Sequence, residues 1–158
     1  MNCVGNENNT EPTFEICNNC SPCKSINKGN FLDVIEVDAA SRTGVDGIRE
    51  IIDAVMYSPN NARFKVYIID EVHMLSNAAF NALLKTLEEP PENVKFIFAT
   101  TEIKKIPATI ISRCQRFDLQ RVDIDTLRTH LSKICESENI KFENDSLFQI
   151  CKASEGSV

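Results

Sequence analysis

Four features are missing from this sequence, and each absence excludes a class of protein. Five glycines occur among the 158 residues and none precedes a lysine, so the G-x-x-x-x-G-K-[ST] loop that cradles phosphates is absent. No apolar run approaches the roughly 20 residues of a membrane-spanning helix. The first residues, Met1 to Gly5, lack the charged and apolar regions of a signal peptide. Acidic side chains outnumber basic ones, 23 to 17, which excludes a generally cationic nucleic-acid binder.

The remaining composition is that of an ordinary globular chain, for which we expect a cytoplasmic location and no membrane partner. Apolar residues make up 42% of the sequence and charged residues 25%, and the pI is near 5.0. The length suits one domain, or one domain with part of another.

Cysteine is abundant, and its number and spacing favour a metal site over disulfide bonds. Seven cysteines cannot all pair, and a chain without an export signal is not expected to carry a disulfide framework. Cys17, Cys20 and Cys23 have C-x2-C-x2-C spacing, and Cys3 lies upstream. Residues 1–30 are otherwise too polar to form a core, so we expect them to need a metal site that holds them together.

From residue 31 onward, apolar strands alternate with helices, which predicts an α/β fold with a parallel sheet. Helical spacing of apolar residues occurs around 48–55 and 80–87, with Ser76 as the N-cap of the second helix. A further short helix is predicted from Pro107. The predicted strands cover residues 33–38, 64–69, 94–99 and, as a fourth, 115–119.

The pattern changes after about Arg121, where two amphipathic helices follow without a strand between them. Cys135 and Cys151 are expected in the core of this region, and His130 is expected as a half-buried packing residue. The region predicts the start of a small helical domain that the chain does not complete. Its apolar positions are Leu127, Leu131, Ile134, Leu147, Ile150 and Cys151.

Polar groups lie at the ends of predicted elements, where open α/β sheets bind ligands. Asp70-Glu71 ends the second strand; one carboxylate suits Mg²⁺ and the other the activation of water, but adjacent acids also suit a helix N-terminus. Thr100-Thr101 ends the third strand, either as ligand-orienting hydroxyls or as turn caps. Arg113 follows a short helix, either as an arginine finger or as a surface residue.

In their order along the chain, these residues and their neighbours resemble one known family. The chain is similar to the gamma/tau family of bacterial clamp-loader subunits, which are AAA+ ATPases of DNA polymerase III. The resemblance covers nearly the whole chain, from Cys3 to about Ser157. It is carried by DAASR (38–42), YIIDEVHML (67–75), NALLKTLEEPP (81–91) and SRC (112–114).

The resemblance implies an AAA+ P-loop-type parallel sheet in three parts. Residues 1–30 would be a zinc module inserted in the ATPase domain, 31–120 the ATPase core, and 121–158 part of a helical lid domain. The sheet would be incomplete, because the first strand and the Walker A loop would precede residue 1, while the sensor 2 arginine would follow Val158. We expect such a fragment to be inactive alone and prone to self-association through exposed sheet edges.

The same resemblance implies roles for individual residues. Asp70 matches the Mg²⁺-associated Walker B carboxylate of the MgATP site, and Glu71 matches the base that activates water. Thr101 matches the sensor 1 position, with Thr100 as the alternative if the register differs by one. Arg113 matches an arginine finger that acts in trans on ATP held by the next subunit.

The family also carries a four-cysteine zinc module, whose pattern Cys3, Cys17, Cys20 and Cys23 match. Four thiolates suit tetrahedral Zn²⁺, which would hold a segment too polar to fold alone. An iron–sulfur cluster uses similar spacing but ordinarily has a further cysteine close downstream, which Cys23 lacks. Free or redox-active thiols are the remaining alternative.

Three functional hypotheses are compatible with the sequence. In the first, the intact protein is an ATP-driven subunit of the DNA polymerase III holoenzyme that loads the sliding clamp onto primed DNA, with delta, delta prime and gamma/tau copies as partners. In the second, the chain is a non-catalytic zinc-containing module for subunit interaction. In the third, it is a zinc-dependent nucleic-acid binder, for which the net charge of −6 leaves little basic surface. The presence of Asp70, Glu71 and Arg113 together favours the first.

Overall fold

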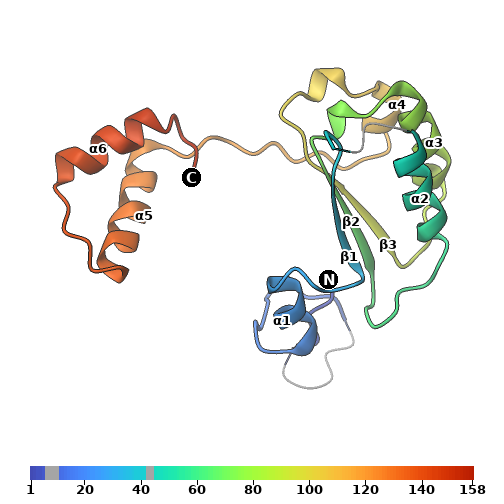
Figure 1. The fold of residues 1–158 in the computed structure, drawn as a ribbon, viewed down its shortest axis with the longest axis horizontal. Helices are drawn as coiled ribbons and strands as arrows, with labels where there is room; N and C mark the ends of the chain where they lie inside the picture. The colour runs from blue at the N-terminus through green and yellow to red at the C-terminus, as the bar shows by residue number, and fades with distance from the viewer. Residues whose placement is uncertain (6–10, 42–44) are drawn as a thin grey trace. The chain divides into compact units, whose positions relative to one another are not determined.

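The chain forms two compact units in the computed structural model, which describes residues 1–5, 11–41 and 45–158 (Figure 1). The first unit comprises Met1–Gln115 and contains the sheet, and the second comprises Arg116–Val158. Arg42, which belongs to the DAASR motif, lies outside the described residues.

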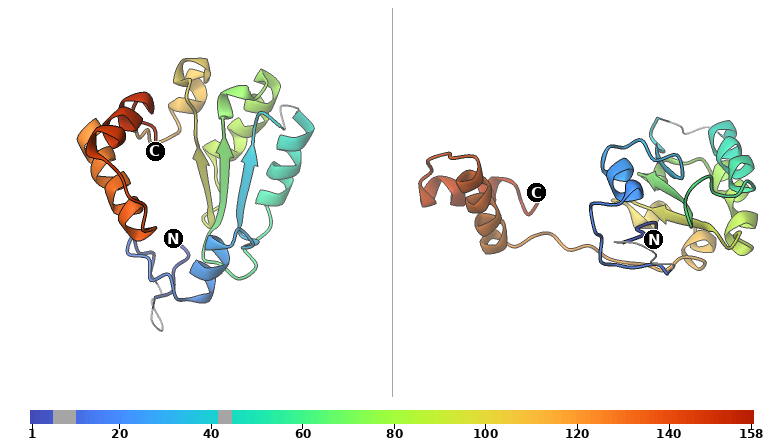
Figure 2. Two further views of the ribbon diagram at one scale, coloured as in Figure 1. Left: turned by 60° about the vertical axis from the view of Figure 1, so that its left-hand side comes forward. Right: turned by 90° about the horizontal axis from the view of Figure 1, so that it is seen from below.

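The first unit is built on a three-stranded parallel sheet with the order β1-β2-β3. Asp38 lies opposite Asp70 and Ile69 lies opposite Phe98, so the carboxyl ends of all three strands meet at one edge (Figure 2). The three strands confirm the predictions to within one residue at each end. Their bounds are β1 (Val34–Asp38), β2 (Lys65–Asp70) and β3 (Val94–Phe98).

Helices α2 (Val45–Val55) and α3 (Asn77–Glu88) cover one face of this sheet (Figure 1). Tyr67 of β2 packs into one core with helix residues such as Ile48 and Leu83, all of them buried. β2 is the central strand and is buried on both faces, as expected for an apolar run in a parallel sheet. This packing fixes the position at which the polar end of β2 emerges.

Short elements at the carboxyl edge of the sheet complete the first unit. Ser76 caps α3 as predicted, because its Oγ accepts a hydrogen bond from the backbone N–H of Ala79 at 3.2 Å. The predicted short helix after Pro107 is confirmed as α4. These elements are η1 (Val72–Met74), η2 (Ile103–Lys105) and α4 (Ala108–Ile111).

Two segments differ from the sequence predictions. Helix α1 (Ser21–Asn27) forms where apolar periodicity is weak, and its signal is Pro22, which occupies the first turn that proline favours. The predicted strand over 115–119 is wrong, because the structure leaves this segment irregular and Phe117 80% exposed. Within the described part of the chain, β3 pairs with β2 alone, so the segment has no neighbouring strand to bond its backbone.

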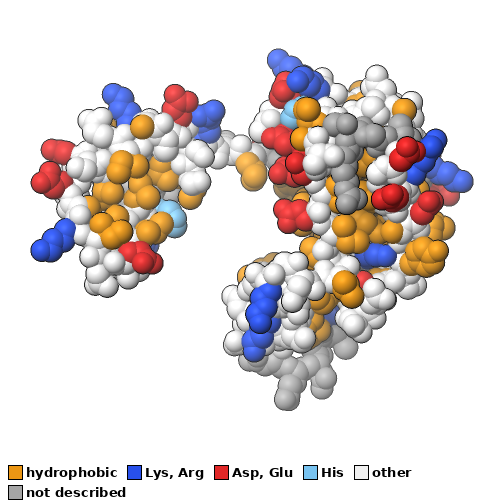
Figure 3. Space-filling model, viewed as in Figure 1, with side chains coloured by type: hydrophobic (Ala, Val, Ile, Leu, Met, Phe, Trp, Pro, Cys, Tyr) orange, Lys and Arg blue, Asp and Glu red, His pale blue; other side chains and the backbone are white. Residues whose placement is uncertain are grey.

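The second unit is a pair of contacting helices, α5 (Ile124–Ser137) and α6 (Asn144–Ala153), as predicted. Leu127, Leu147 and Cys151 are its buried apolar residues. Further apolar side chains gather on an exposed face of this unit (Figure 3). Those that remain exposed include Ile124, Ile134, Ile140, Phe148 and Ile150.

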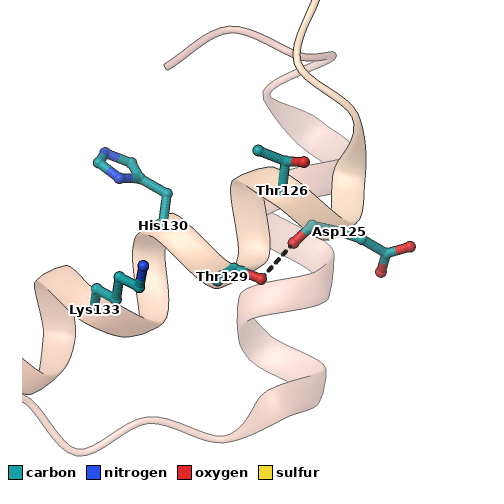
Figure 4. A pocket seen from close by; sticks show the side chains of 5 residues that line it. All are labelled: Asp125, Thr126, Thr129, His130 and Lys133. Atoms are coloured by element: carbon teal, nitrogen blue, oxygen red, sulfur yellow. Dashed lines mark hydrogen bonds between the residues drawn. The ribbon is translucent and has the colours of Figure 1, made fainter.

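Two side chains of α5 lie differently from their predicted positions. His130 is exposed rather than half-buried, because it projects from α5 toward solvent (Figure 4). Cys135 is only partly buried, whereas Cys151 is buried as predicted. Throughout the described ranges, each helix is too short or too polar to cross a membrane.

Candidate functional site

Asp70 and Glu71 lie at the carboxyl edge of the sheet, directly after β2. The side chain of Asp70 is exposed, and its Oδ1 accepts the backbone N–H of Glu71 at 2.8 Å. Glu71 has φ 45° and ψ 43°, a left-handed conformation that is costly for a residue with a Cβ. The following residue, Val72, is buried and donates its N–H to the carbonyl of Ala99 at 3.0 Å, which fixes the turn against the end of β3.

The threonines that follow β3 lie beside this pair, as their positions at neighbouring strand ends predict. Thr101 Oγ1 donates a hydrogen bond to Glu71 Oε2 at 3.3 Å. Thr100 Oγ1 lies 3.0 Å from His73 Nδ1 and accepts the backbone N–H of Glu102 at 3.0 Å. Both hydroxyls therefore belong to the site, but only Thr101 touches Glu71 directly.

His73, for which the sequence favours a local hydrogen bond over a role as base or ligand, is a further member of this site. Its side chain is 7% exposed, and Nδ1 lies 3.1 Å from Glu71 Oε2 while Nε2 lies 3.5 Å from Glu102 Oε1. Lys105 Nζ binds the same Glu102 oxygen at 2.7 Å. That hydrogen bond, more than the nearby imidazole, holds the pKa of Glu102 below its ordinary value.

Arg113 lies after α4 and contacts groups other than Asp70 and Glu71. Its guanidinium forms an ion pair with Glu88 at the end of α3 and donates to the Thr109 carbonyl at 2.7 Å. The side chain is 33% exposed, so solvent reaches part of it. The site residues predicted from the sequence thus separate into a carboxylate–threonine group and a lone arginine held by Glu88.

Cys3, Cys17, Cys20 and Cys23 form a compact cluster, with all four Sγ atoms within 4.8 Å of one another. A tetrahedral Zn²⁺ with Zn–S bonds of about 2.3 Å requires Sγ atoms about 3.8 Å apart, so the donor set fits this ion. Backbone N–H groups already point at sulfur: that of Cys17 donates to Cys3 Sγ at 3.4 Å, and that of Cys20 to Cys17 Sγ at 3.3 Å.

Three thiols of this cluster have pKa values shifted from that of an ordinary cysteine. A backbone hydrogen bond from Cys23 lowers the pKa of Cys20 to about 6, while burial raises the pKa of Cys23 to about 12. Backbone hydrogen bonds from Cys17 and Gly5 lower the pKa of Cys3. Since a metal binds thiolates, the lowered pKa values of Cys20 and Cys3 would favour a metal at this cluster, and binding would release the proton of Cys23.

The cluster is attached to the amino end of β2, opposite the carboxylates. The Asn2 amide, in a residue 5% exposed, donates to the Phe64 carbonyl at 2.9 Å and accepts the Phe64 N–H at 3.0 Å. Arg63 Nη2 donates to the Cys3 carbonyl at 3.0 Å. The cysteine segment is therefore joined to the strand that carries Asp70.

A shallow hollow on α5 in the second unit has no comparable chemistry. Thr129 uses its hydroxyl within the helix, donating to the Asp125 carbonyl at 2.9 Å, and His130 projects away from its neighbours (Figure 4). All residues that line this hollow come from one helix, so we assign the hollow no ligand. The lining residues are Asp125, Thr126, Thr129, His130 and Lys133.

Solved structures with a similar fold include two proteins of Thermotoga maritima. A DNA polymerase III gamma subunit-related protein from Thermotoga maritima matches with a TM-score of 0.57 and 28% identity, over 75% of this chain and 42% of its own. The Holliday junction branch migration motor RuvB of the same organism matches with a TM-score of 0.62 and 17% identity, over 78% of this chain and 41% of its own. The likeness to RuvB shows the fold alone.

Sequence relatives confirm the resemblance to gamma/tau subunits. DNA polymerase III subunit tau/gamma of Haemophilus influenzae is 56% identical over 142 residues, which are 90% of this chain and 21% of the relative. Subunit tau of Bacillus subtilis is 55% identical over 147 residues, which are 93% of this chain and 26% of the relative. The chain thus spans only part of these proteins.

A model of the family described as DNA polymerase III, delta subunit matches residues 1–123. Because these residues are most of the sequence, the chain belongs to that family.

Proposed function

We propose that this chain is the part of a clamp-loader ATPase subunit that carries the hydrolytic carboxylates and an arginine for the neighbouring subunit. The intact protein hydrolyses ATP in the DNA polymerase III holoenzyme to load the sliding clamp onto primed DNA, with delta, delta prime and gamma/tau copies as partners. The observation that carries the proposal is the Glu71 carboxylate at the sheet edge beside Asp70, which accepts a hydrogen bond from Thr101 and lies 3.1 Å from His73 Nδ1.

Each residue at the edge has a role in this reaction. Asp70 is exposed at the end of β2, as a carboxylate that holds Mg²⁺ directly or through water must be. The ion neutralises charge on the phosphates. Glu71 accepts the proton of the attacking water, and Thr101 senses the nucleotide, with Thr100 as the alternative.

Arg113 acts in trans, on ATP held by the next subunit. Its guanidinium is partly exposed and bound to Glu88, so it must exchange this ion pair for phosphate oxygens when a neighbour docks. Complexes in which a single subunit carries Arg113→Ala test this role. We expect hydrolysis to fail at the neighbour's site while the altered subunit still hydrolyses its own ATP.

Residues 1–30 are proposed as a structural zinc module, residues 31–120 as the ATPase core and residues 121–158 as part of a helical lid. The close approach of the four Sγ atoms supports the zinc assignment. Zinc would hold the polar N-terminal segment together and would take no part in hydrolysis. We propose a cytoplasmic location, as for replication proteins in general.

Substitution of Glu71 in the full-length protein tests the proposed function. Glu71→Gln keeps the shape of the side chain but removes the base, so we expect kcat for ATP hydrolysis to fall about 10²- to 10⁴-fold with nucleotide binding retained. Glu89→Gln, on an exposed acid after α3, is the matched control and should leave kcat unchanged. If Glu71→Gln hydrolyses ATP at the normal rate, Glu71 is not the base; if the unaltered protein hydrolyses no ATP, the chain is instead a non-catalytic module for subunit interaction.

Calorimetric titration of MgATP into the 158-residue chain tests whether these residues suffice for binding. We expect no detectable heat and no turnover, because the sequence contains no glycine-rich loop with its lysine. Saturable binding that Asp70→Asn abolishes would contradict this expectation, since it would place a complete nucleotide site within these residues.

A further inference from the structure

His73 lies at the centre of the carboxylate site, although it neither ends a strand nor belongs to the acidic pair. Its ring projects from η1 and is nearly buried, with polar atoms of three residues around its two nitrogens. Nδ1 faces Glu71 Oε2 at 3.1 Å and Thr100 Oγ1 at 3.0 Å, and Nε2 faces Glu102 Oε1 at 3.5 Å. The imidazole therefore joins the turn after β2 to the turn after β3.

The partners of Nδ1 determine where the ring carries a proton. A carboxylate accepts hydrogen bonds and donates none, so Nδ1 can donate to Glu71 Oε2 only in the ring form that carries hydrogen on Nδ1, whereas the Thr100 hydroxyl can pair with Nδ1 in either form. The hydroxyl oxygen of Thr100 lies on the same side and is held by the Glu102 backbone N–H at 3.0 Å. Burial and the Thr100 contact hold the ring in place, with Nδ1 3.1 Å from Glu71 Oε2.

The two oxygens of Glu71 have different surroundings. Oε2 lies 3.1 Å from His73 Nδ1 and accepts a hydrogen bond from the Thr101 hydroxyl at 3.3 Å. No hydrogen bond from the described residues reaches Oε1. The backbone at Glu71 is left-handed, so the side chain leaves the strand in a direction that ordinary strand geometry would not give. One oxygen is anchored and the other is open to a water molecule.

We propose that His73 is a positioning residue that anchors Glu71 Oε2 so that Oε1 is presented to the attacking water. This inference rests on the proposed role of Glu71 as the base in ATP hydrolysis. In this role His73 holds Glu71 in place, and Glu71 remains the base. Loss of His73 should affect the chemical step more than nucleotide binding, because a misplaced base lowers the rate without removing a contact to the nucleotide.

Three substitutions at this position separate anchoring from packing. His73→Asn places an amide nitrogen near the position of Nδ1, His73→Gln places one near Nε2, and His73→Ala removes both. In the full-length protein within its complex, we expect His73→Ala and His73→Gln to lower kcat about 10- to 100-fold with KM changed less than about twofold. His73→Asn should restore most of kcat. Equal losses in Asn and Gln variants, or an unchanged kcat in the Ala variant, would overturn the proposal.

Thermal unfolding of the same variants excludes a purely structural effect. Asn and Gln are similar in polarity, so we expect their unfolding midpoints to differ little while their kcat values differ about tenfold or more. A kcat that follows the unfolding midpoint across the three variants would show that His73 only packs the turn, and would overturn the proposal.

Variants in the Glu71→Gln background distinguish this inference from the proposed function. If Glu71→Gln lowers kcat and His73→Ala adds no further loss to it, the two residues act as one unit and the proposal is supported. If Glu71→Gln lowers kcat and His73→Ala adds its full loss, only the role of His73 is overturned. If Glu71→Gln leaves kcat unchanged, the base assignment itself fails, and the role of His73 fails with it.

Discussion

At the scale of single residues, buried polar groups carry much of the specificity of this fold. Asp33 is 1% exposed just before β1, and its two carboxylate oxygens accept the backbone N–H groups of Asn60 and Asn61, each at 2.9 Å. These bonds fix the long connection that leads into β2. By contrast, the hydroxyl of Tyr67 is buried with no hydrogen-bond partner among the described residues.

Substitution of Asp33 should therefore destabilise the first unit. Asp33→Ala removes the acceptor of two backbone N–H groups, and we expect a loss of about 1–3 kcal/mol in the free energy of unfolding, measured with urea. Tyr67→Phe is the matched control, because it removes an unpartnered hydroxyl and should preserve or raise stability. A similar loss in both variants would mean that volume, rather than hydrogen bonding, governs this region.

The cysteines predict a pH dependence of chemical modification in the metal-free chain. Cys20, with its pKa lowered to about 6, is a thiolate at pH 7, whereas Cys23, with its pKa raised to about 12, stays a thiol. Iodoacetamide should modify Cys20 first, with a rate that rises with pH and levels off above about 7. Mass spectrometry of the peptides checks this. Modification of Cys23 before Cys20 would contradict the assignment.

At the scale of elements, strands and helices were predictable where burial and periodicity agree. β2 and β3 are largely apolar runs, and α3 carries both an apolar face and a capping serine. The segment 115–119 has the composition of a strand, but a strand needs a neighbour, and sequence pattern does not reveal whether one is present. Helix α1 is held by its cysteines and its proline rather than by an apolar face.

The candidate site was predictable to the same extent. Asp70, Glu71 and Thr101 follow from the rule that neighbouring parallel strands end at one edge. The contacts of His73 depend on the left-handed backbone of Glu71, which no local sequence pattern predicts. The ion pair between Arg113 and Glu88 depends on how α3 and α4 pack. Contacts set by tertiary packing are the part that sequence reasoning missed.

A hydrogen bond joins the two ends of the second unit, and it depends on one glycine after α6. Gly156 has φ +81°, and its carbonyl accepts the Val122 N–H at 3.1 Å. A Cβ at this position would lie 2.8 Å from both Arg121 Cβ and the Val122 carbonyl oxygen. The turn therefore needs glycine for its conformation and for the space around it.

Replacement of this glycine should loosen the two-helix unit. We expect Gly156→Ala to cost about 2–4 kcal/mol in that unit, from strain and steric overlap together. Gly29→Ala is the control, since Gly29 also has a positive φ of +67° but no atom within 4 Å of its Cβ position, and should cost only about 1 kcal/mol. Hydrogen exchange of the α6 amides measures the difference. Equal effects of the two variants would show that overlap contributes nothing.

At the scale of the whole molecule, the two units should respond separately to metal. If zinc occupies the cysteine cluster, the purified chain contains one zinc per molecule, and a chelator removes it. We expect faster hydrogen exchange in α1 and at the start of β2, because Asn2 and Arg63 attach the cluster there. Helices α5 and α6 belong to the other unit and serve as the internal control. Unchanged exchange in α1 after chelation would contradict a structural metal.

The attachment of the cluster to one end of β2 and of the carboxylates to the other has a consequence for how this protein can change. Six residues of extended strand span about 20 Å, and the packed sheet makes that span stiff. A substitution inside β2 would therefore shift both the cysteine cluster at its amino end and the carboxylates at its carboxyl end. A relative without these cysteines would need other contacts to hold the amino end of β2. Without them, the carboxylates at the carboxyl end of the strand would not keep their positions.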